Sequence, residues 1–530
     1  MPDLIHDLIF DSARRTPAAP ALVYGAQRLD YARLAAHVGD AAGALLDCGV
    51  APGERVAVYL EKRIENVAAL FGAAAAGAVF VPVNPLLKAE QVAYILADCN
   101  VRVLLTSPER LAQLAPALQG CPDLHTVFVT GAAEPAPAAA PLPACRRWNP
   151  AQRAPGADAL AARRRIDADV AAILYTSGST GKPKGVVLSH RNLVAGASSV
   201  AAYLGNTAED RILSVLPLSF DYGLSQLTTA FLCGATVVLM NHLFAKDIPA
   251  MVREERITGL AAVPPLWIQL AALDWPRDCT LRYLTNSGGA MPVPTTAALR
   301  AALPGAQLFL MYGLTEAFRS TYLPPSELDR RPDSMGRAIP NAEVMVVRPD
   351  GSRCAPNEAG ELVHRGALVA LGYWNDPAKT AERFRPVPGQ DSALPLAEMA
   401  VWSGDTVRMD EEGFLYFLGR HDDMIKVSGY RVSPSEVEEA VHASGLVREA
   451  AAFGVPHPSL GQAIVLLALG RDAGVSAAAL LKECQRRLPA YMVPAHVALR
   501  DEPFPRNPNG KFDRNLLRQA YSTLFESPAR

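Results

Sequence analysis

The sequence predicts an α/β fold divided into more than one domain. Its 530 residues exceed what a single hydrophobic core normally holds. Over residues 1–130, helical patterns alternate with short apolar runs, which indicates a largely parallel sheet covered by helices. Residues 335–420 instead carry closely spaced strand-like runs and glycine turns, so a small antiparallel unit is expected there. A polar run, His421-Asp-Asp423, favours a domain boundary near residue 420.

The first elements follow a helix-then-strand order. Leu34–Leu46 is an amphipathic, alanine-rich pattern that predicts a helix, and Arg55–Leu60 predicts a strand after it. The same order recurs twice before residue 131. Residues 131–165 are rich in alanine and proline and poor in large apolar side chains, so they predict a loose surface connection. Ser189 predicts the N-cap of the next helix, which makes His190 a surface or cap residue.

Several later strand-like runs end in small, polar or acidic residues. One ends shortly before Asp221, another at Thr285–Gly289 and a third at Met311–Glu316. In open α/β sheets, ligands bind outside the carboxyl ends of the strands, so these three endings are expected to meet. Glu316 is the candidate Mg²⁺ ligand, because this hard ion takes carboxylate and phosphate oxygens. The alternative is a helix N-terminal glutamate favoured by the helix dipole.

The composition disfavours several classes of protein. The formal net charge of −2 argues against a general preference for nucleic acid or anionic membranes. Eight cysteines are scattered without a Cys-x-x-Cys pair, which argues against zinc and against a disulfide framework and fits a reducing cytosol. The N-terminus lacks a basic segment followed by an apolar one, so no signal peptide is expected. The prediction is a cytoplasmic protein with no membrane insertion and no nucleic-acid partner.

Residues Thr176–Gly185 read Thr-Ser-Gly-Ser-Thr-Gly-Lys-Pro-Lys-Gly and predict a phosphate-binding loop. Glycine lets several backbone N–H groups point toward one anion, hydroxyls add donors, and the two lysines add charge. It is not a Walker loop, because Thr176 and Pro183 stand where that motif has glycine and a hydroxyl residue. The alternative, a flexible surface turn, explains the glycines but not two lysines on either side of a proline.

Five motifs occur in one order along essentially the whole chain. Together they resemble the adenylate-forming enzymes, which include acyl-CoA synthetases, adenylation domains and luciferases. The five motifs are Tyr175–Gly185, Tyr312–Glu316, Ser403–Asp405, Gly419–Lys426 with Gly429–Arg431, and Asn509–Lys511. A narrower resemblance is to the AMP-forming acyl-CoA ligases found with exosortase A systems. The stretches that carry it are Leu216–Leu224, Asn286–Pro292 and Gly313–Tyr322.

The resemblance implies a fold and a reaction. The expected fold is a large domain, residues 1–420, of two α/β sheet subdomains and a small β-barrel-like unit, followed by a small, mobile α+β domain, residues 421–530. A carboxylate would attack the α-phosphorus of ATP, releasing pyrophosphate and leaving an acyl-AMP. A thiol, from coenzyme A (CoA) or from the phosphopantetheine of a carrier protein, would then displace AMP to give a thioester.

The resemblance also implies a nucleotide site. Asp405 would bind the ribose hydroxyls with Arg420 beside it, and Thr315 would contact the α-phosphate. The β- and γ-phosphates would be held by Thr176, Ser177, Gly178, Ser179, Thr180, Gly181, Lys182 and Lys184, with Thr180 and Glu316 at the metal. The remaining nucleotide contacts, including the adenine frame, would come from Gly288, Gly289, Ala290, Tyr312, Gly313, Tyr416 and Arg431.

Lys511 would be a catalytic residue of the first half-reaction. A cation about 3–4 Å from an α-phosphate oxygen is worth several kcal/mol in a dry site, yet the attacking thiol needs the same space. The family solves this conflict by rotating the C-terminal domain at a hinge, which matches Asp422 here. Rotation would exchange Lys511 for the face that carries Ser428 and Gly429, where the glycine leaves room for a pantetheine arm.

The acyl pocket is expected to contain Asp221, Tyr222, Ser287, Met311 and Arg319. In amino-acid adenylation domains, an Asp at the place of Asp221 pairs with the α-amino group of the substrate, whereas many fatty-acid ligases have a His-containing phrase there. Asp221 and Arg319 in one cavity would suit an amino acid or an acid with a second acid group. The alternative is that they pair with each other.

The leading hypothesis is therefore a ligase that takes its acceptor in trans, as CoA or a separate carrier protein, since no carrier-protein serine motif is seen. An amino-acid adenylation enzyme that loads a carrier protein is the first alternative. A catalytically silent nucleotide-binding protein is disfavoured, because Lys511, Glu316 and both loop lysines are present. An enzyme that stops at the adenylate, or oxidises it, also remains open.

The role implied for Lys511 gives a first prediction. Lys511→Ala should abolish acyl-AMP formation from the acid and ATP, because the cation at the α-phosphate is lost. The same variant should still make thioester from supplied acyl-AMP and thiol. Pyrophosphate release and thioester formation, measured separately, check this, and an equal loss in both would contradict it.

Overall fold

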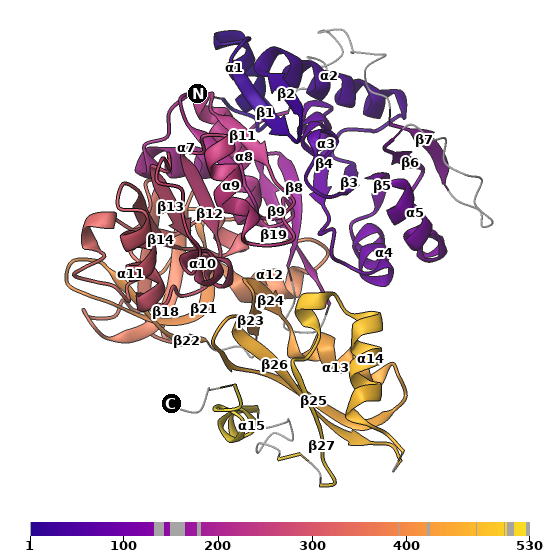
Figure 1. Cartoon of the computed structure of the whole chain (residues 1–530), viewed down its shortest axis with the longest axis vertical. Coiled ribbons are helices and arrows are strands. Elements are labelled where there is room, and N and C mark those ends of the chain that lie inside the picture. The colour runs from indigo at the N-terminus through magenta and orange to yellow at the C-terminus, as the bar shows by residue number, and fades with distance from the viewer. Residues whose placement is uncertain are drawn as a thin grey trace.

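The computed structural model describes residues 2–131, 143–148, 165–176, 182–391, 393–420, 424–472, 474–502, 504–505 and 514–525. Within these segments the strands form four sheets, two large and mixed and two small (Figure 1). The α/β fold predicted from the sequence is confirmed. No helix in the described segments is long and apolar enough to cross a membrane.

The first large sheet has a parallel centre covered by helices. Its elements are β3 (Arg55–Tyr59), α3 (Ile64–Ala75), β4 (Val79–Pro82), α4 (Ala89–Asp98), β5 (Val101–Thr106), α5 (Pro108–Leu114), β6 (Thr126–Val129), β7 (Ala144–Arg147), β8 (Val170–Thr176), β9 (Lys184–Ser189) and β19 (Gly372–Tyr373). As far as it is described, the strand order is β19-β9-β8-β4-β3-β5-β6-β7. The predicted alternation of helix and strand over residues 1–130 is confirmed.

The second large sheet combines the middle of the chain with its beginning. Its strands are β1 (Pro20–Tyr24), β2 (Gln27–Asp30), β10 (Arg211–Ser214), β11 (Thr236–Leu239), β12 (Gly259–Ala262), β13 (Tyr283–Asn286), β14 (Gln307–Tyr312), β15 (Thr321–Leu323) and β16 (Arg337–Ala338). Its helices are α1 (Asp7–Arg15), α2 (Tyr31–Asp47), α7 (His190–Leu204), α8 (Asp221–Cys233), α9 (Asp247–Glu254), α10 (Pro264–Ala271) and α11 (Val293–Ala302). β1 pairs with β11 in parallel, so the first strands join the later sheet.

The two small sheets follow in sequence. The third sheet, antiparallel as predicted, contains β17 (Ala342–Val347), β18 (Ala359–Gly366), β20 (Phe384–Pro386), β21 (Met399–Met409) and β22 (Leu415–Arg420), with α12 (Pro377–Arg383) beside it. The fourth contains β23 (Ile425–Val427), β24 (Tyr430–Val432), β25 (Val447–His457), β26 (Gly461–Gly470) and β27 (His496–Leu499). Its helices are α13 (Pro434–His442), α14 (Ala477–Arg487) and α15 (Arg514–Ala520).

Two local predictions are corrected in part. Residues 131–165 were expected to be a loose connection, yet β7 lies inside them and pairs in parallel with β6. His190 was expected to be a surface or cap residue; it begins α7 directly after the cap, but it is only 1% exposed. Its Nδ1 accepts a hydrogen bond from the backbone N–H of Ile5 at 3.1 Å, and burial lowers the pKa of the imidazole to about 3. The predicted cap is confirmed, because Ser189 and Asn192 form a capping box on α7.

The C-terminal unit, residues 424–525, packs against the N-terminal part beside α4 (Figure 1). Gln91 of α4 donates from Nε2 to Oε1 of Glu436 on α13 at 2.9 Å. The orientation of Gln91 is fixed, because its Oε1 also accepts the N–H of Lys88 and so caps α4. Oε2 of Glu436 is buried and has no hydrogen-bond partner among the described residues. Burial raises the pKa of Glu436 to about 7, although the hydrogen bond from Gln91 opposes this, so packing of the C-terminal unit favours the protonated carboxyl.

Docking of the C-terminal unit should therefore depend on pH. Between the ordinary pKa of 4.5 and about 7, Glu436 holds a proton in the packed state that it releases when exposed, so stability falls as pH rises through that window. Glu436→Gln should flatten this slope in thermal unfolding measured from about pH 5 to 8. Glu502→Gln, an exposed change in the same unit, should keep the wild-type slope. An unchanged slope in Glu436→Gln would contradict the assignment.

Candidate active site

A cavity of about 640 Å³ lies where the carboxyl ends of strands from both large sheets face the C-terminal unit. The three strand endings singled out from the sequence meet here, since Asp221, Ser287 and Glu316 all line it. The predicted site residues among its lining are Thr176, Asp221, Ser287, Gly288, Tyr312, Gly313, Thr315, Glu316, Arg319, Asp405, Ser428, Gly429 and Arg431. The C-terminal unit therefore completes the wall of a cavity that begins in the N-terminal part.

Other predicted residues lie elsewhere. Tyr222 and Met311 line a smaller space of about 20 Å³ behind Arg319. Those that do not line the main cavity are Lys182, Lys184, Gly289, Ala290 and Tyr416. The hydroxyl of Tyr416 donates instead to Asp410 at 3.1 Å. Outside the described residues lie Ser177, Gly178, Ser179, Thr180, Gly181, Asp422 and Lys511, and the side chain of Arg420 is likewise not described.

Glu316 is a buried carboxylate in the wall of this cavity. Its Oε1 accepts a hydrogen bond from the hydroxyl of Tyr373 on β19 at 2.6 Å. Burial alone would raise its pKa, but the positive charges of Arg431 and Arg383 hold the pKa below its ordinary value. Glu316 belongs to a three-residue 3₁₀ turn, which has little dipole to offer, so its environment is set by these contacts rather than by a helix end.

The lysines beside the phosphate loop lie over aromatic rings. Nζ of Lys184 is 5.3 Å from the ring centre of Tyr373, whose hydroxyl binds Glu316. Burial and the nearby charge of Lys379 lower the pKa of Lys184. Tyr373 thus connects the end of the predicted phosphate loop to the predicted metal ligand.

Asp405 and Tyr312 form the second polar group. The hydroxyl of Tyr312 donates to Oδ2 of Asp405, which is buried on β21. Arg420 is the cross-strand partner of Asp405 in the pairing of β21 with β22, as expected for neighbours. His364 on β18 stacks under the ring of Tyr312, with centroids 6.0 Å apart, and burial lowers its pKa to about 3, so the imidazole is neutral. Sequence reasoning missed His364. The available signal was its position two residues after Leu362 in a strand, because residues two apart in a strand lie on the same face, and both are buried.

Asp221 and Arg319 form a buried ion pair. Their side chains are 4% and 2% exposed, and Oδ2 of Asp221 lies 3.7 Å from Nη1 of Arg319. Burial raises the pKa of Asp221, although the guanidinium opposes this. The guanidinium also lies over the ring of Tyr222, 4.5 Å from its centre. The alternative in which the two charged groups pair with each other is therefore realised, inside the cavity rather than away from it.

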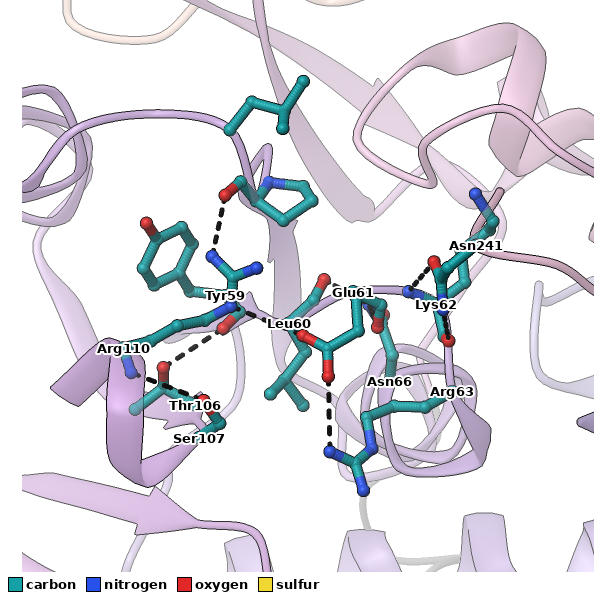
Figure 2. Close-up of polar contacts among 12 residues, drawn as sticks. Tyr59, Leu60, Glu61, Lys62, Arg63, Asn66, Thr106, Ser107, Arg110 and Asn241 are labelled. Atoms are coloured by element: carbon teal, nitrogen blue, oxygen red, sulfur yellow. Dashed lines mark hydrogen bonds and ion pairs between the residues drawn. The ribbon is translucent and has the colours of Figure 1, made fainter. Parts of the chain in front are cut away.

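One wall of the cavity is formed by the loop after β3 (Figure 2). Lys62 in this loop is buried, donates from Nζ to the carbonyl of Val215 at 2.9 Å, and has its pKa lowered to about 8 by burial. Asn241 accepts from the Lys62 N–H at 3.2 Å and donates to its carbonyl at 2.7 Å. Because Val215 and Asn241 follow β10 and β11, this wall ties the two large sheets together. Sequence reasoning missed Lys62, whose only signal was its place directly after a strand.

Comparison with known proteins places the chain in a family. The model of the AMP-binding enzyme matches residues 9–374, and the model of the AMP-binding enzyme C-terminal domain matches residues 436–511. The chain belongs to the AMP-binding enzymes. The resemblance to adenylate-forming enzymes is thereby confirmed. The narrower resemblance to ligases of exosortase A systems stays a prediction.

Individual members of the family resemble the whole chain. It is 33% identical over 524 residues to an L-proline–[L-prolyl-carrier protein] ligase from Pseudomonas fluorescens, covering 97% of this chain and 98% of that one. It is 30% identical over 499 residues to a long-chain-fatty-acid–CoA ligase from Salmonella typhimurium, covering 89% and 86%. The structure resembles o-succinylbenzoate CoA synthetase from Bacillus subtilis with a TM-score of 0.81 and 26% identity, covering 97% and 98%. The chain spans only 10% of the length of a linear gramicidin synthase from Brevibacillus parabrevis, with 31% identity.

The contact of Gly429 with the N-terminal part gives a prediction about docking. Gly429 has φ of +84°, and a Cβ there would lie 2.7 Å from Cγ1 of Val263. Gly429→Ala should slow thioester formation from supplied acyl-AMP by about tenfold or more, given the ~1–3 kcal/mol cost of overpacking. Pyrophosphate release in the first half-reaction should fall less.

Gly445→Ala is the matched control for this variant. Gly445 also has positive φ, +73°, but a Cβ there meets nothing within 4 Å. It should therefore carry only the penalty of the left-handed backbone, about 1–2 kcal/mol of stability. Equal effects of both variants on the thioester rate would contradict a specific role for the Gly429 contact.

Proposed function

We propose that the chain is an ATP-dependent ligase that activates a carboxylic acid as an acyl-AMP and transfers the acyl group to a thiol. The observation that supports this most directly is the meeting of Glu316, the Asp405–Tyr312 pair and Gly429 around one cavity. A buried carboxylate suits metal-bound phosphates, the Asp–Tyr pair suits a nucleoside, and a glycine at the edge suits an entering thiol. These are the three ligands that such a reaction must bring together.

In this proposal Asp405 binds the ribose of ATP. A carboxylate has enough lone pairs to accept from both hydroxyls of a cis-diol while it also accepts from Tyr312. The ring of Tyr312 is supported from below by neutral His364, so its face is held for contact with the adenine. Arg420, the cross-strand partner of Asp405, is the cation that we propose beside this carboxylate.

The described residues fit Mg²⁺, which we propose as the cofactor. Glu316 supplies a carboxylate whose pKa is held below its ordinary value, and Thr176 at the start of the predicted loop lines the same cavity. Bound Mg²⁺ would neutralise charge on the phosphates as pyrophosphate leaves. Tyr373 holds the Glu316 carboxylate in place by donating to Oε1.

We assign the docked arrangement of the C-terminal unit to thioester formation. Ser428, Gly429 and Arg431 line the cavity in this arrangement, and Arg431 contributes positive charge at Glu316. That charge would help to hold AMP while the thiol attacks. CoA and the phosphopantetheine of a separate carrier protein are both acceptors of the required chemistry.

Loading of an amino acid onto a carrier protein is the second candidate. The observation that favours it is Asp221, which begins α8 and lines the cavity. The prolyl-carrier protein ligase among the relatives has a substrate of this kind. A panel of acids separates the two candidates, because the ammonium group is the feature that distinguishes them.

The proposal is tested with fatty acids, dicarboxylic acids, hydroxy acids and amino acids, each with ATP, Mg²⁺ and either CoA or a carrier protein. At least one acid should release pyrophosphate and AMP and yield a thioester. Glu316→Gln should lower the rate by about 100-fold or more, the scale for losing one charged group at developing charge. Glu209→Gln, an exposed change, should not. Failure of every acid, or full activity in Glu316→Gln, would contradict the proposal.

A further inference from the structure

Arg319 is a buried cation whose hydrogen-bonding groups are largely unmatched. Its side chain is 2% exposed, and Nε and Nη2 have no hydrogen-bond partner among the residues that the structure describes. Nη1 lies 3.7 Å from Asp221, which is a charge pair but too long for a hydrogen bond. Buried donors in proteins are nearly always satisfied, so these N–H groups point to a missing acceptor.

A strained turn directs Arg319 to the cavity. Phe318, the residue before it, has φ of 52° and ψ of −51°, and the N–H of Arg319 donates to the carbonyl of Ala317 at 2.6 Å. This is a γ-turn with positive φ, which is rare and costly for a bulky residue. The ring of Phe318 is fully buried against Gly196, where a Cβ would lie 2.4 Å from it. Packing therefore maintains the strain, and maintained strain is typical of functional positions.

The space around Arg319 limits what can reach it. On one side lies the main cavity, which Arg319 lines together with Asp221. On the other side lies the space of about 20 Å³ shared with Tyr222 and Met311, which holds about one water. The hydroxyl of Tyr222, which also lines this small space, is hydrogen-bonded to Thr285 at 2.6 Å. A space for one water is too small for a substrate chain, so a substrate group would reach Arg319 from the main cavity.

We propose that the acid activated by this chain carries a second oxygen acceptor that binds Nε and Nη2 of Arg319. This inference rests on the proposed function, because it names the substrate class of the same cavity. Short dicarboxylic, hydroxy and oxo acids belong to this class. An unsubstituted aliphatic acid would leave both N–H groups buried and unmatched, which is the costly arrangement.

The same contacts disfavour an amino acid. An ammonium group that approaches Asp221 also comes close to the guanidinium of Arg319, because the two side chains are 3.7 Å apart. Repulsion between two cations in a dry cavity offsets the attraction to the carboxylate. Asp221 instead balances the charge of Arg319. The ion pair is therefore close to neutral, and it presents the N–H groups of Arg319 to an oxygen acceptor.

The test compares acids that differ only in the second oxygen, using the full chain with ATP and Mg²⁺. The pairs are glutarate against pentanoate and 3-hydroxybutanoate against butanoate, with 4-aminobutanoate as the amine. The oxygenated acid of at least one pair should show a kcat/KM for pyrophosphate release about 100-fold or more above its partner, as in sites built to bind a hydroxyl. Equal or higher values for the unsubstituted acids or the amine would overturn the inference.

Variants then assign the preference to Arg319. Arg319→Met removes the donors but keeps a long side chain, so the preference should fall below about tenfold. Arg300→Met, an exposed arginine paired with Asp329, is the matched control and should keep the wild-type ratio. Asp221→Asn removes a negative charge that repels a second carboxylate but not a hydroxyl. It should therefore raise kcat/KM for glutarate more than for 3-hydroxybutanoate, which distinguishes the two kinds of acceptor. A wild-type ratio in Arg319→Met would overturn the inference.

Binding without catalysis separates this inference from the proposed function. Glutarate and 3-hydroxybutanoate are titrated calorimetrically into the full chain and into Arg319→Met, with Arg319→Lys in its place if the methionine variant does not fold. If no acid releases pyrophosphate but an oxygenated acid binds only the wild type, the proposed function fails, while Arg319 is still shown to bind the second oxygen of an acid. If acids are activated without preference for the second oxygen, the inference fails and the function stands.

Discussion

The turn between β14 and β15 is the constraint on which the cavity depends. Within five residues it delivers Thr315, Glu316 and Arg319 to one wall. These three side chains reach the same wall because Phe318 adopts a positive φ. The conformation persists because the ring of Phe318 fills the space left by Gly196. With an ordinary φ at Phe318 the chain would continue past the cavity, and Arg319 would leave the carboxylate of Asp221. Packing thus stabilises a backbone that local preference opposes.

The charge of Glu316 links this turn to the C-terminal unit. Its carboxylate is fully buried, and two cations offset that burial: Arg383 from the N-terminal part and Arg431 from the C-terminal unit. When the C-terminal unit undocks, one of these two charges is removed. By thermodynamic reciprocity, whatever neutralises Glu316 must also weaken its attraction to Arg431. A metal ion at Glu316, as we propose, and a docked C-terminal unit would therefore be coupled, which would suit a reaction whose two halves need different arrangements.

Much of this molecule follows from local sequence patterns, and the exceptions share one cause. The cap at Ser189 and the polar ends of parallel strands were predictable, because short-range patterns and sheet topology determine them. His190 was misplaced because its burial comes from Ile5, far away in sequence. Lys62 and His364 were missed for the same reason, since the residues that they contact, Val215 and Tyr312 respectively, are also far away in sequence. Residue type and spacing do not report such distant partners.

Two buried ionisable side chains, Glu436 and Lys62, make the cavity more negative as pH rises. Glu436 has a pKa raised to about 7 and Lys62 a pKa lowered to about 8, and both line the cavity. Below pH 7 the carboxyl is neutral and the lysine is charged; above pH 8 the reverse holds. The net charge of the cavity therefore falls by two units across this interval, which weakens its attraction for phosphates and carboxylates. Because burial of Glu436 in the docked arrangement favours its protonated form, docking and anion binding are strengthened together by the same protons.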